Sequence, residues 1–550
     1  MTGSAPHRYN VSLFSRERIL FLSLLFGTAF LALLRLGALP LTDPDEAVYG
    51  QVGKELARLP VSHWLTPLYD GKPWFDKPPL FYWLSALSMR AFGVSEFAAR
   101  LPSALMSVVL VGATYALGQR ACPQIPRVGL WAGFALATNI QFFMLSRAAV
   151  TDMTLAACLT VALLALWAWA VTHQARWALL AGLATGMAVL TKGPAFLILI
   201  GAQAVFFLCL TRQARRLLSP ALWGGFIVSL LVSVPWFALM IHQHGQRFIQ
   251  GFLEANNVTR YLKAEHQSTQ AFWFFLPVFL GLFFPWTVAL PATVRDVWRQ
   301  VKEEWHSPSQ LSPTIFLALW FVLVFLFFSV SQSKLITYIF PLYPVAAILV
   351  GHQIYIRVKE GQSDWPLLAV TLLLYFVCLA LAIESSRYGV DSLTRSLWLL
   401  TAFGQIFIRQ RFQDRQRRWI VPGMATALIL LIAWCSPVWK TKETEISERL
   451  LTRAAPPGQT IYALGLKKPS LRFYAAGPVV YTDDHLEAQA DIQSHSGRIY
   501  AMRPEDLDAM RPQVSAQDYT LLQTERRTVL LRATPPAFQK LPQHDTIPTR

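Results

Sequence analysis

Blocks of about 20 apolar residues recur along most of this 550-residue chain, and no other feature constrains its fold as strongly. About 20 such residues are what an α-helix needs to cross the roughly 30 Å of hydrocarbon in a bilayer. A soluble chain of this length would instead divide into domains with charged surfaces, whereas only 15% of these residues are Asp, Glu, Lys or Arg. We therefore expect a polytopic α-helical membrane protein. Its thirteen predicted spans lie near 19–39, 98–118, 128–147, 153–172, 176–191, 194–211, 222–242, 272–293, 313–330, 336–352, 366–383, 392–408 and 419–437.

The placement of basic residues predicts how these spans are oriented. The first block is too long for the core of a cleaved signal peptide and has no small-residue cleavage site, so we expect an uncleaved helix. If the N-terminus is cytoplasmic, every short basic loop falls on the cytoplasmic side, as the positive-inside rule requires. This pattern requires that 176–211 form two spans. A single span there would move all later basic loops to the opposite side of the membrane. The basic loops carry Arg120, Arg127, Arg176, Arg212, Arg215, Arg216, Arg295, Arg299, Lys302, Arg357, Lys359, Arg409, Arg411, Arg415, Arg417 and Arg418.

The net charge of +17 is therefore a topology signal, with contact to anionic membrane lipids as a second role. It gives no reason to expect a nucleic-acid partner. The expected location is a bacterial inner membrane, and the sequence leaves the oligomeric state open. No phosphate-binding glycine loop occurs, so ATP-driven transport has no support.

Residues 439–550 differ in composition from the predicted membrane domain, 1–438. They are polar and alternate helix-like stretches such as Glu505–Met510 with short β-rich runs, which are Ile461–Leu464, Val479–Thr482, Ile499–Met502 and Val529–Arg532. This alternation predicts a small α/β domain. Thirteen spans would place it in the periplasm, where we expect a cap or lid, because it contains no catalytic cluster. None of the five cysteines is placed for an external disulfide, and none has metal-ligand spacing.

The first long outer segment concentrates the candidates for chemistry. Asp45 and Glu46 follow a proline, as is typical of a helix start, and Glu46–Leu59 has one apolar face. That pattern predicts an amphipathic helix on the membrane surface, and Phe81–Phe92 predicts a second, so juxtamembrane helices are expected within 45–92. The ordinary explanation of acidic residues at such a position is that they cap the helix and complement its dipole.

Several other polar residues fall on the same predicted side of the membrane. Charges at membrane depth are costly and usually face a polar cavity. Each residue alone is explained better by structure than by catalysis, but together they indicate one site. They are Arg147, Asp152, Lys192, Arg260, Lys263, His266, Lys334 and Tyr338.

An ordered set of motifs runs through this region. It comprises DPDEAVYGQVGKEL, WFDKPPLFYW, FAARLPSAL, SRAAVTDMT, LTKGP and SKLITYIFPLYP. Over roughly residues 15–440 the chain closely resembles bacterial lipid-linked-sugar glycosyltransferases of the GT-C fold. The aminoarabinose transferases that act on lipid A are the nearest relatives, and protein O-mannosyltransferases are more distant. The resemblance implies a polyprenyl-phosphate sugar donor, an acceptor on the periplasmic face such as lipid A or another envelope glycan, and inversion at the sugar.

The resemblance also implies roles for individual residues. The family's essential Asp at the start of the first juxtamembrane helix matches Asp45. Glu46, which follows it, is the second catalytic candidate, and Tyr49 is a substrate-binding candidate. The Lys that holds the carrier phosphate matches Lys77 in WFDKPP, with Tyr82 shortly after it. The remaining substrate-binding candidates are Asp152, Arg260, His266, Lys334 and Tyr338.

Three positions depart from the pattern of the aminoarabinose enzymes. Those enzymes usually have Tyr and Glu where this chain has Trp74 and Asp76, and Arg where it has Val48. The departures leave the sugar and the acceptor open.

The residue types suit transfer from a lipid phosphate. Breaking the glycosidic bond builds negative charge on the leaving phosphate, which Lys77, Arg260 and Lys334 would stabilise. A carboxylate near C1, assigned to Asp45, would either deprotonate a hydroxyl acceptor or stabilise positive charge on the sugar. If the acceptor is itself a phosphate, orientation and charge matter more than deprotonation.

Three alternatives stay open. Asp76 and His266 have ligand types that suit Zn or Mn, but a hydrogen-bonded pair or two unrelated polar residues explains them better, and no cofactor is required. A transporter or flippase for a lipid-linked precursor would also use polar residues in spans. It should have an internal repeat or paired broken helices, which the sequence does not show. A protein O-glycosyltransferase of the same fold is the alternative among enzymes.

Overall fold

The computed structural model describes residues 11–259, 262, 271–305, 311–361, 365–387, 392–411, 418–435, 452–525 and 528–534. By its internal contacts the chain divides into two compact units. The helical unit comprises 1–38 and 52–437, and the α/β unit comprises 39–51 and 438–550. The segment 39–51, which carries Asp45, thus belongs with the tail.

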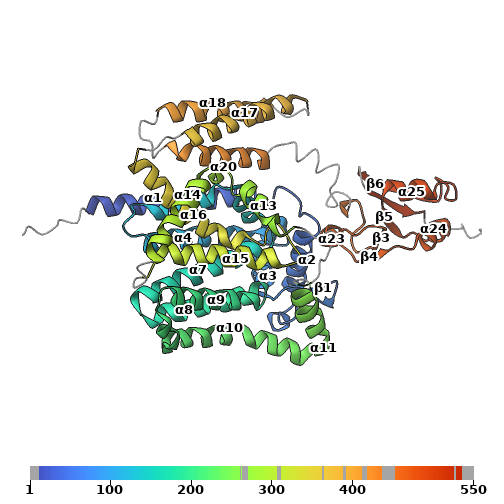
Figure 1. Cartoon of the computed structure of the whole chain (residues 1–550). Coiled ribbons are helices and arrows are strands. Elements are labelled where there is room, and N and C mark those ends of the chain that lie inside the picture. The colour runs from blue at the N-terminus through green and yellow to red at the C-terminus, as the bar shows by residue number, and fades with distance from the viewer. Residues whose placement is uncertain are drawn as a thin grey trace, which may run out of the picture. The chain divides into compact units, whose positions relative to one another are not determined.

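The helical unit is a bundle of long apolar helices joined by short turns (Figure 1). Its helices, with α2 shared between the units, are α1 (Val11–Leu33), α2 (Asp45–Arg58), α3 (Leu80–Phe92), α4 (Glu96–Ala121), α5 (Val128–Ala137), α6 (Ile140–Ser146), α7 (Thr151–Thr172), α8 (Ala175–Lys192), α9 (Ala195–Leu210), α10 (Pro220–His244), α11 (Gln246–Phe248), α13 (Phe275–Leu282), α14 (Leu290–Trp305), α15 (Pro313–Val330), α16 (Tyr343–Lys359), α17 (Trp365–Arg387), α18 (Ser392–Arg411) and α20 (Ile420–Cys435). Shorter elements are the 3₁₀ turns η1 (Val61–His63), η2 (Ala214–Leu218), η4 (Phe272–Phe274), η5 (Trp286–Ala289) and η6 (Phe340–Leu342), the π-helix η3 (Ile249–Thr259), and the hairpin strands β1 (Leu68–Tyr69) and β2 (Lys72–Pro73).

Each of the thirteen predicted spans coincides with helix in this bundle. Among the described residues, five helices are long and apolar enough to cross a membrane, or seven if each of two bent pairs counts as one span. The five are α4, α7, α10, α15 and the apolar part of α17. The predicted total of thirteen spans and the orientation therefore remain predictions.

Local chemistry explains where the helices break. Between α8 and α9, Gly193 has a φ of 126° and Pro194 follows, so one continuous helix is excluded and 176–211 forms two helices as predicted. Between α5 and α6 the Asn139 side chain accepts a hydrogen bond from Phe142 N at 2.9 Å, which starts a new helix at a bend of 68°.

The predicted span 272–293 is bent more sharply. Its apolar part ends at Leu282, and the chain resumes in Trp286–Glu304 at 110° to it. Pro285 lies in the break, and the second part is amphipathic rather than apolar, since it carries the charges from Arg295 onward.

The α/β unit contains a five-stranded sheet of order β4-β3-β5-β7-β6 (Figure 1). Strand β3 pairs in parallel with β4 and β5, and β7 pairs antiparallel with β5 and β6. The strands are β3 (Ile461–Leu464), β4 (Val479–Thr482), β5 (Ile499–Met502), β6 (Tyr519–Glu525) and β7 (Thr528–Ala533), and the helices are α23 (Pro469–Tyr474), α24 (His485–Gln493) and α25 (Pro504–Met510). The predicted α/β domain is confirmed, and its four predicted strands coincide with β3, β4, β5 and β7.

Candidate active site

The segment that enters α2 is held by its acidic residues. The Glu46 carboxylate accepts hydrogen bonds from Thr42 N at 2.8 Å and Thr42 Oγ1 at 3.0 Å, and the side chain is buried. Glu46 therefore closes the turn before the helix in the manner of a capping box. Asp45, one residue earlier on the first turn of α2, is exposed. The two carboxylates predicted to be catalytic thus have different surroundings, and only that of Asp45 is accessible to a substrate.

Asp43 fixes the same segment within the α/β unit. Its carboxylate accepts hydrogen bonds from the backbone N and the hydroxyl of Ser470, at the start of α23. The Tyr474 hydroxyl accepts a further bond from Leu41 N at 2.7 Å. These contacts tie the approach to α2 to the helix that follows β3, so they give the tail a structural role in placing Asp45.

Further along α2 the packing needs small residues. A β-carbon added at Gly53 would lie 2.4 Å from Ser85 Oγ of α3, so only glycine allows the two juxtamembrane helices this approach. Glu55 accepts backbone hydrogen bonds from Asp70 at 2.8 Å and Gly71 at 3.0 Å, and thereby holds the turn of the β1–β2 hairpin. The two helices predicted within 45–92 are present, and the substrate-binding candidates Tyr49 on α2 and Tyr82 on α3 are both buried.

The WFDKPP motif lies between this hairpin and α3. Lys77 is buried, and its Nζ lies 3.0 Å from the Asp76 carboxylate. The neighbouring Phe75 packs against the rings of His244 and Phe248, and its carbonyl accepts a hydrogen bond from Asn256 Nδ2 at 3.2 Å. The motif is thus a braced loop that presents a buried ammonium group.

Three of the motifs meet at the ends of α7 and α8. Asp152, in the first turn of α7, accepts a hydrogen bond from Lys192 Nζ in the last turn of α8 at 2.6 Å. Both side chains are about nine-tenths buried. The ammonium group also lies 4.9 Å from the ring centroid of Tyr338. Each charge complements the dipole at its helix end, so the pair is favourable where it stands.

Lys334 lies in the segment between α15 and η6. Its Nζ donates to the carbonyl of Ser331, and partial burial lowers the pKa of the ammonium group. Gln141 Nε2 donates to the Ile336 carbonyl at 2.7 Å, which anchors this segment to α6. The side chains of Lys77, Asp152, Lys192 and Lys334 are therefore each held by a hydrogen bond.

Arg147 forms hydrogen bonds at the end of a neighbouring helix. Its guanidinium group donates to the carbonyls of Leu31, Ala32 and Leu34 at the end of α1, and it lies 4.3 Å from the Trp434 ring centroid. Arginine here caps a helix C-terminus, as the macrodipole favours. The expectation that Arg147 also joins the site stays a prediction.

Arg260 and His266 lie outside the described residues, so nothing tests their predicted roles or the metal pair of Asp76 with His266. Within the described part of the chain, no group of three or more His, Cys, Asp or Glu could hold a metal ion. Sequence reasoning placed Lys192 among the polar outer residues but not beside Asp152, because spacing along the chain does not show which helix ends meet.

Comparison with known proteins gives these arrangements a context. The family model described as dolichyl-phosphate-mannose-protein mannosyltransferase matches residues 76–238. An undecaprenyl phosphate-alpha-4-amino-4-deoxy-L-arabinose arabinosyl transferase of Pseudomonas aeruginosa (strain UCBPP-PA14) is 32% identical over 327 residues, which are 58% of this chain and 57% of that protein. A second such transferase, from Pseudomonas fluorescens (strain Pf0-1), is 28% identical over 75% of each chain. The chain thus spans a little over half the length of the first of these relatives.

Two solved structures are similar in fold. ArnT from Cupriavidus metallidurans bound to undecaprenyl phosphate has a TM-score of 0.75 and 21% identity, over 94% of this chain and 98% of that one. The archaeal oligosaccharyltransferase AglB from Archaeoglobus fulgidus has a TM-score of 0.52 and 13% identity, over 92% and 72%. The predicted polytopic membrane fold of GT-C glycosyltransferases is confirmed, as is the resemblance to aminoarabinose transferases.

Proposed function

We propose that this protein is a membrane glycosyltransferase that transfers a sugar, of the aminoarabinose type, from undecaprenyl phosphate to lipid A. The observation that supports it best is the 32% identity with an undecaprenyl phosphate-aminoarabinose arabinosyl transferase. The buried Asp152–Lys192 pair adds a physical reason, because charges are retained inside a membrane bundle where a polar substrate group must be held.

In this proposal the oxygen of the acceptor attacks C1 of the sugar while the bond from C1 to the phosphate oxygen breaks. The electron pair leaves with the lipid phosphate, and the configuration at C1 inverts. Lys77, Arg260 and Lys334 stabilise the charge that builds on this phosphate. Lys77 and Lys334 are held in place by hydrogen bonds, so little reorganisation is needed as charge develops.

Asp45 accepts the proton of an acceptor hydroxyl, or orients the acceptor if that group is a phosphate. Glu46 is a positioning residue, because its carboxylate is already engaged with Thr42. Tyr49, Tyr82, Asp152, His266 and Tyr338 bind substrate. The reaction takes place on the periplasmic face of the inner membrane, with the N-terminus cytoplasmic and the tail periplasmic.

Mass spectrometry of lipid A tests this function in cells. We compare wild type, a deletion strain, and strains with Asp45→Asn or Glu487→Gln at matched expression. Glu487 is an exposed carboxylate on α24 of the same unit and serves as the control. The expected result is loss of one sugar from lipid A in the deletion and in Asp45→Asn, with the sugar retained in Glu487→Gln.

Other results would point elsewhere. Loss of a sugar from proteins instead of lipid A would favour protein O-glycosylation, the activity in the name of the matching family model. Accumulation of a lipid-linked precursor on the inner leaflet, with no change in any glycan of Asp45→Asn, would replace the transferase by a flippase.

A further inference from the structure

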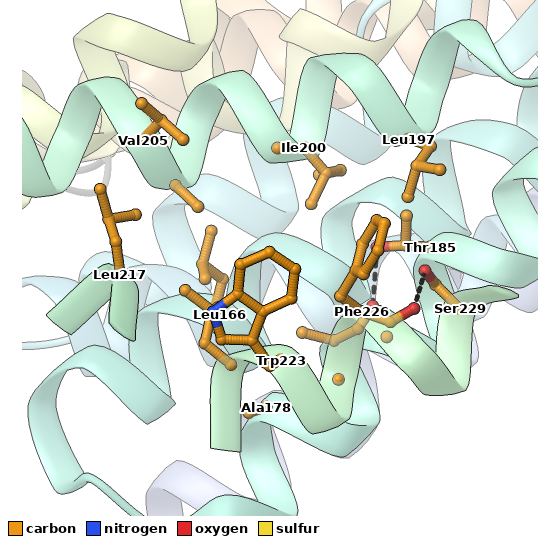
Figure 2. A pocket seen from close by; sticks show the side chains of 16 residues that line it. Leu166, Ala178, Thr185, Leu197, Ile200, Val205, Leu217, Trp223, Phe226 and Ser229 are labelled. Carbon is orange, nitrogen blue, oxygen red and sulfur yellow. Dashed lines mark hydrogen bonds between the residues drawn. The ribbon is translucent and has the colours of Figure 1, made fainter. Parts of the chain in front are cut away.

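An apolar cavity of about 400 Å³ lies among α7, α8, α9, η2 and α10. This volume is within the range of about 300 to 1,000 Å³ that is typical of small-molecule sites. Figure 2 shows Trp223 and Phe226 of α10 across from Leu197, Ile200 and Val205 of α9, with Leu217 of η2 at one end. The cavity therefore lies between helices of one unit.

The lining is almost entirely apolar. The hydroxyl of Thr185 donates to the Ala181 carbonyl at 2.7 Å, and that of Ser229 donates to the Phe226 carbonyl at 2.7 Å. All other residues that line it are glycines or have aliphatic or aromatic side chains. A cavity lined in this way does not hold ordered water and suits a hydrocarbon chain.

Small residues create the space. A β-carbon at Gly182 would lie 1.9 Å from the Gly225 carbonyl oxygen, so α8 and α10 touch through their backbones and leave room beside the contact. Nothing lies within 4 Å of a β-carbon added at Gly201, on the α9 side. The rim is open, since Val205, Phe226 and Trp223 are 43%, 42% and 54% exposed.

The ends of the helices show where along the bundle the cavity lies. It is lined by α8 as far as Thr185 and by the first half of α10, whereas Lys192 is the last residue of α8. Along α8 the lining residue nearest to Lys192 is Thr185, seven residues or about 10 Å of helix before it, and on α9 the lining begins at Leu197, five residues after Lys192. On α7, α8 and α10 the lining is thus displaced from the Asp152–Lys192 pair toward the predicted cytoplasmic end.

A basic segment lies at that end. Arg212 and Arg215 are exposed and stand in the short connection that also contributes Leu217 to the lining. Arg216 is tied to the Ala170 carbonyl at the end of α7. Trp223, which is half exposed, is the kind of residue found at membrane interfaces. An apolar slot beside exposed guanidinium groups matches a hydrocarbon chain attached to an anionic headgroup.

We propose that this cavity binds one acyl chain of an anionic glycerophospholipid of the cytoplasmic leaflet, whose phosphate lies at Arg212 and Arg215. The site is separate from that of the proposed sugar donor, and the proposal does not depend on transferase activity. Its effect is to fill the space beside the α8–α10 contact in the membrane.

Native mass spectrometry of the full-length protein tests this site. The protein is released from nanodiscs of equal parts phosphatidylcholine and phosphatidylglycerol, and the retained lipids are counted. Gly201→Phe fills the cavity, and Gly27→Phe is the matched control, because a β-carbon at Gly27 on α1 also meets nothing within 4 Å. Thermal unfolding of both variants in the same nanodiscs establishes that they are folded.

We expect wild type and Gly27→Phe to retain one phosphatidylglycerol that Gly201→Phe lacks. Occupancy should fall at least tenfold, about the change expected when burial of two methylene groups is lost. Equal retention in a folded Gly201→Phe would overturn the proposal. So would finding a polyprenyl phosphate bound there in preference to phospholipid, or a wild-type dimer that Gly201→Phe converts to a monomer.

A second variant tests the headgroup independently of the cavity. Arg212→Gln combined with Arg215→Gln should keep a bound lipid but lose the preference for phosphatidylglycerol over phosphatidylcholine. The control, Arg127→Gln with Arg411→Gln, removes the same charge from two exposed positions and should keep the preference. An unchanged preference in the first variant would refute the assigned role of these arginines.

Discussion

Replacing Lys192 by Gln should leave Asp152 buried without its cation. At 2.6 Å the attraction between the two charges is about 6 kcal/mol if the effective dielectric constant is about 20. Desolvation offsets part of this, and removing one partner of a buried pair typically costs about 3 to 5 kcal/mol. We therefore expect Lys192→Gln to lower the melting temperature in nanodiscs by several degrees. The second variant, Asp152→Asn with Lys192→Gln, removes both charges and should recover most of that loss.

The same two variants test whether the Asp152–Lys192 pair only stabilises the fold or whether Asp152 also binds substrate. If Asp152 binds substrate, the double variant recovers stability but not sugar transfer, whereas a purely structural pair would recover both. A melting temperature of Lys192→Gln equal to that of wild type would refute the reasoning about burial. So would a double variant that is no more stable than the single one.

Four further predictions follow from individual contacts. Gly182→Val should destabilise the bundle by about 1 to 3 kcal/mol in thermal unfolding, because its β-carbon would meet the Gly225 carbonyl oxygen. Gly281→Val should not destabilise it, because no atom lies within 4 Å of a β-carbon added there. Arg147→Gln should lower the stability of the fold by about 1 to 3 kcal/mol, because it leaves carbonyls at the end of α1 without a donor. Arg127→Gln, at an exposed position, should not change the stability, and equal melting temperatures of the two variants would contradict the capping role. Asp43→Asn should weaken the bonds to Ser470 and lower sugar transfer with Asp45 intact, and unchanged transfer would show that Ser470 does not help to place α2. Burial lowers the pKa of Lys334 and so disfavours its charged form in the folded state; Lys334→Met should therefore be more stable than wild type near neutral pH. That advantage should vanish as the pH rises through the lowered pKa toward 10.5, and a difference independent of pH over this window would contradict it.

The sequence predicted those features that depend on local pattern. Apolar length marked each helix, Gly193 with Pro194 marked the break between α8 and α9, and alternation marked four of the five strands. Strand β6 was missed because Tyr519–Glu525 mixes polar and apolar residues without a clear turn signal on either side. The bend within 272–293 was missed because composition alone did not register Pro285 as the end of an apolar helix.

Long-range partners were beyond the sequence for a physical reason. Asp152 and Lys192 are 40 residues apart, and Asp43 and Ser470 are 427 apart, so only the packing of the elements brings them together. The same holds for Arg147, whose position at the predicted outer end of a span is compatible with either a binding site or a helix cap. In the structure its guanidinium group caps the end of α1, and its part in the site stays a prediction.

Transfer in a detergent micelle tests the central claim most directly. Purified wild type and Asp45→Asn are mixed with undecaprenyl-phosphate aminoarabinose and lipid A, and both lipids are followed by mass spectrometry. A micelle has no two leaflets, so a flippase would give no product there. We predict that with the wild type the donor is consumed and an equal amount of lipid A gains one sugar. With Asp45→Asn, both lipids should remain unchanged. An intact donor with folded wild-type protein, or equal transfer by Asp45→Asn, would contradict the account.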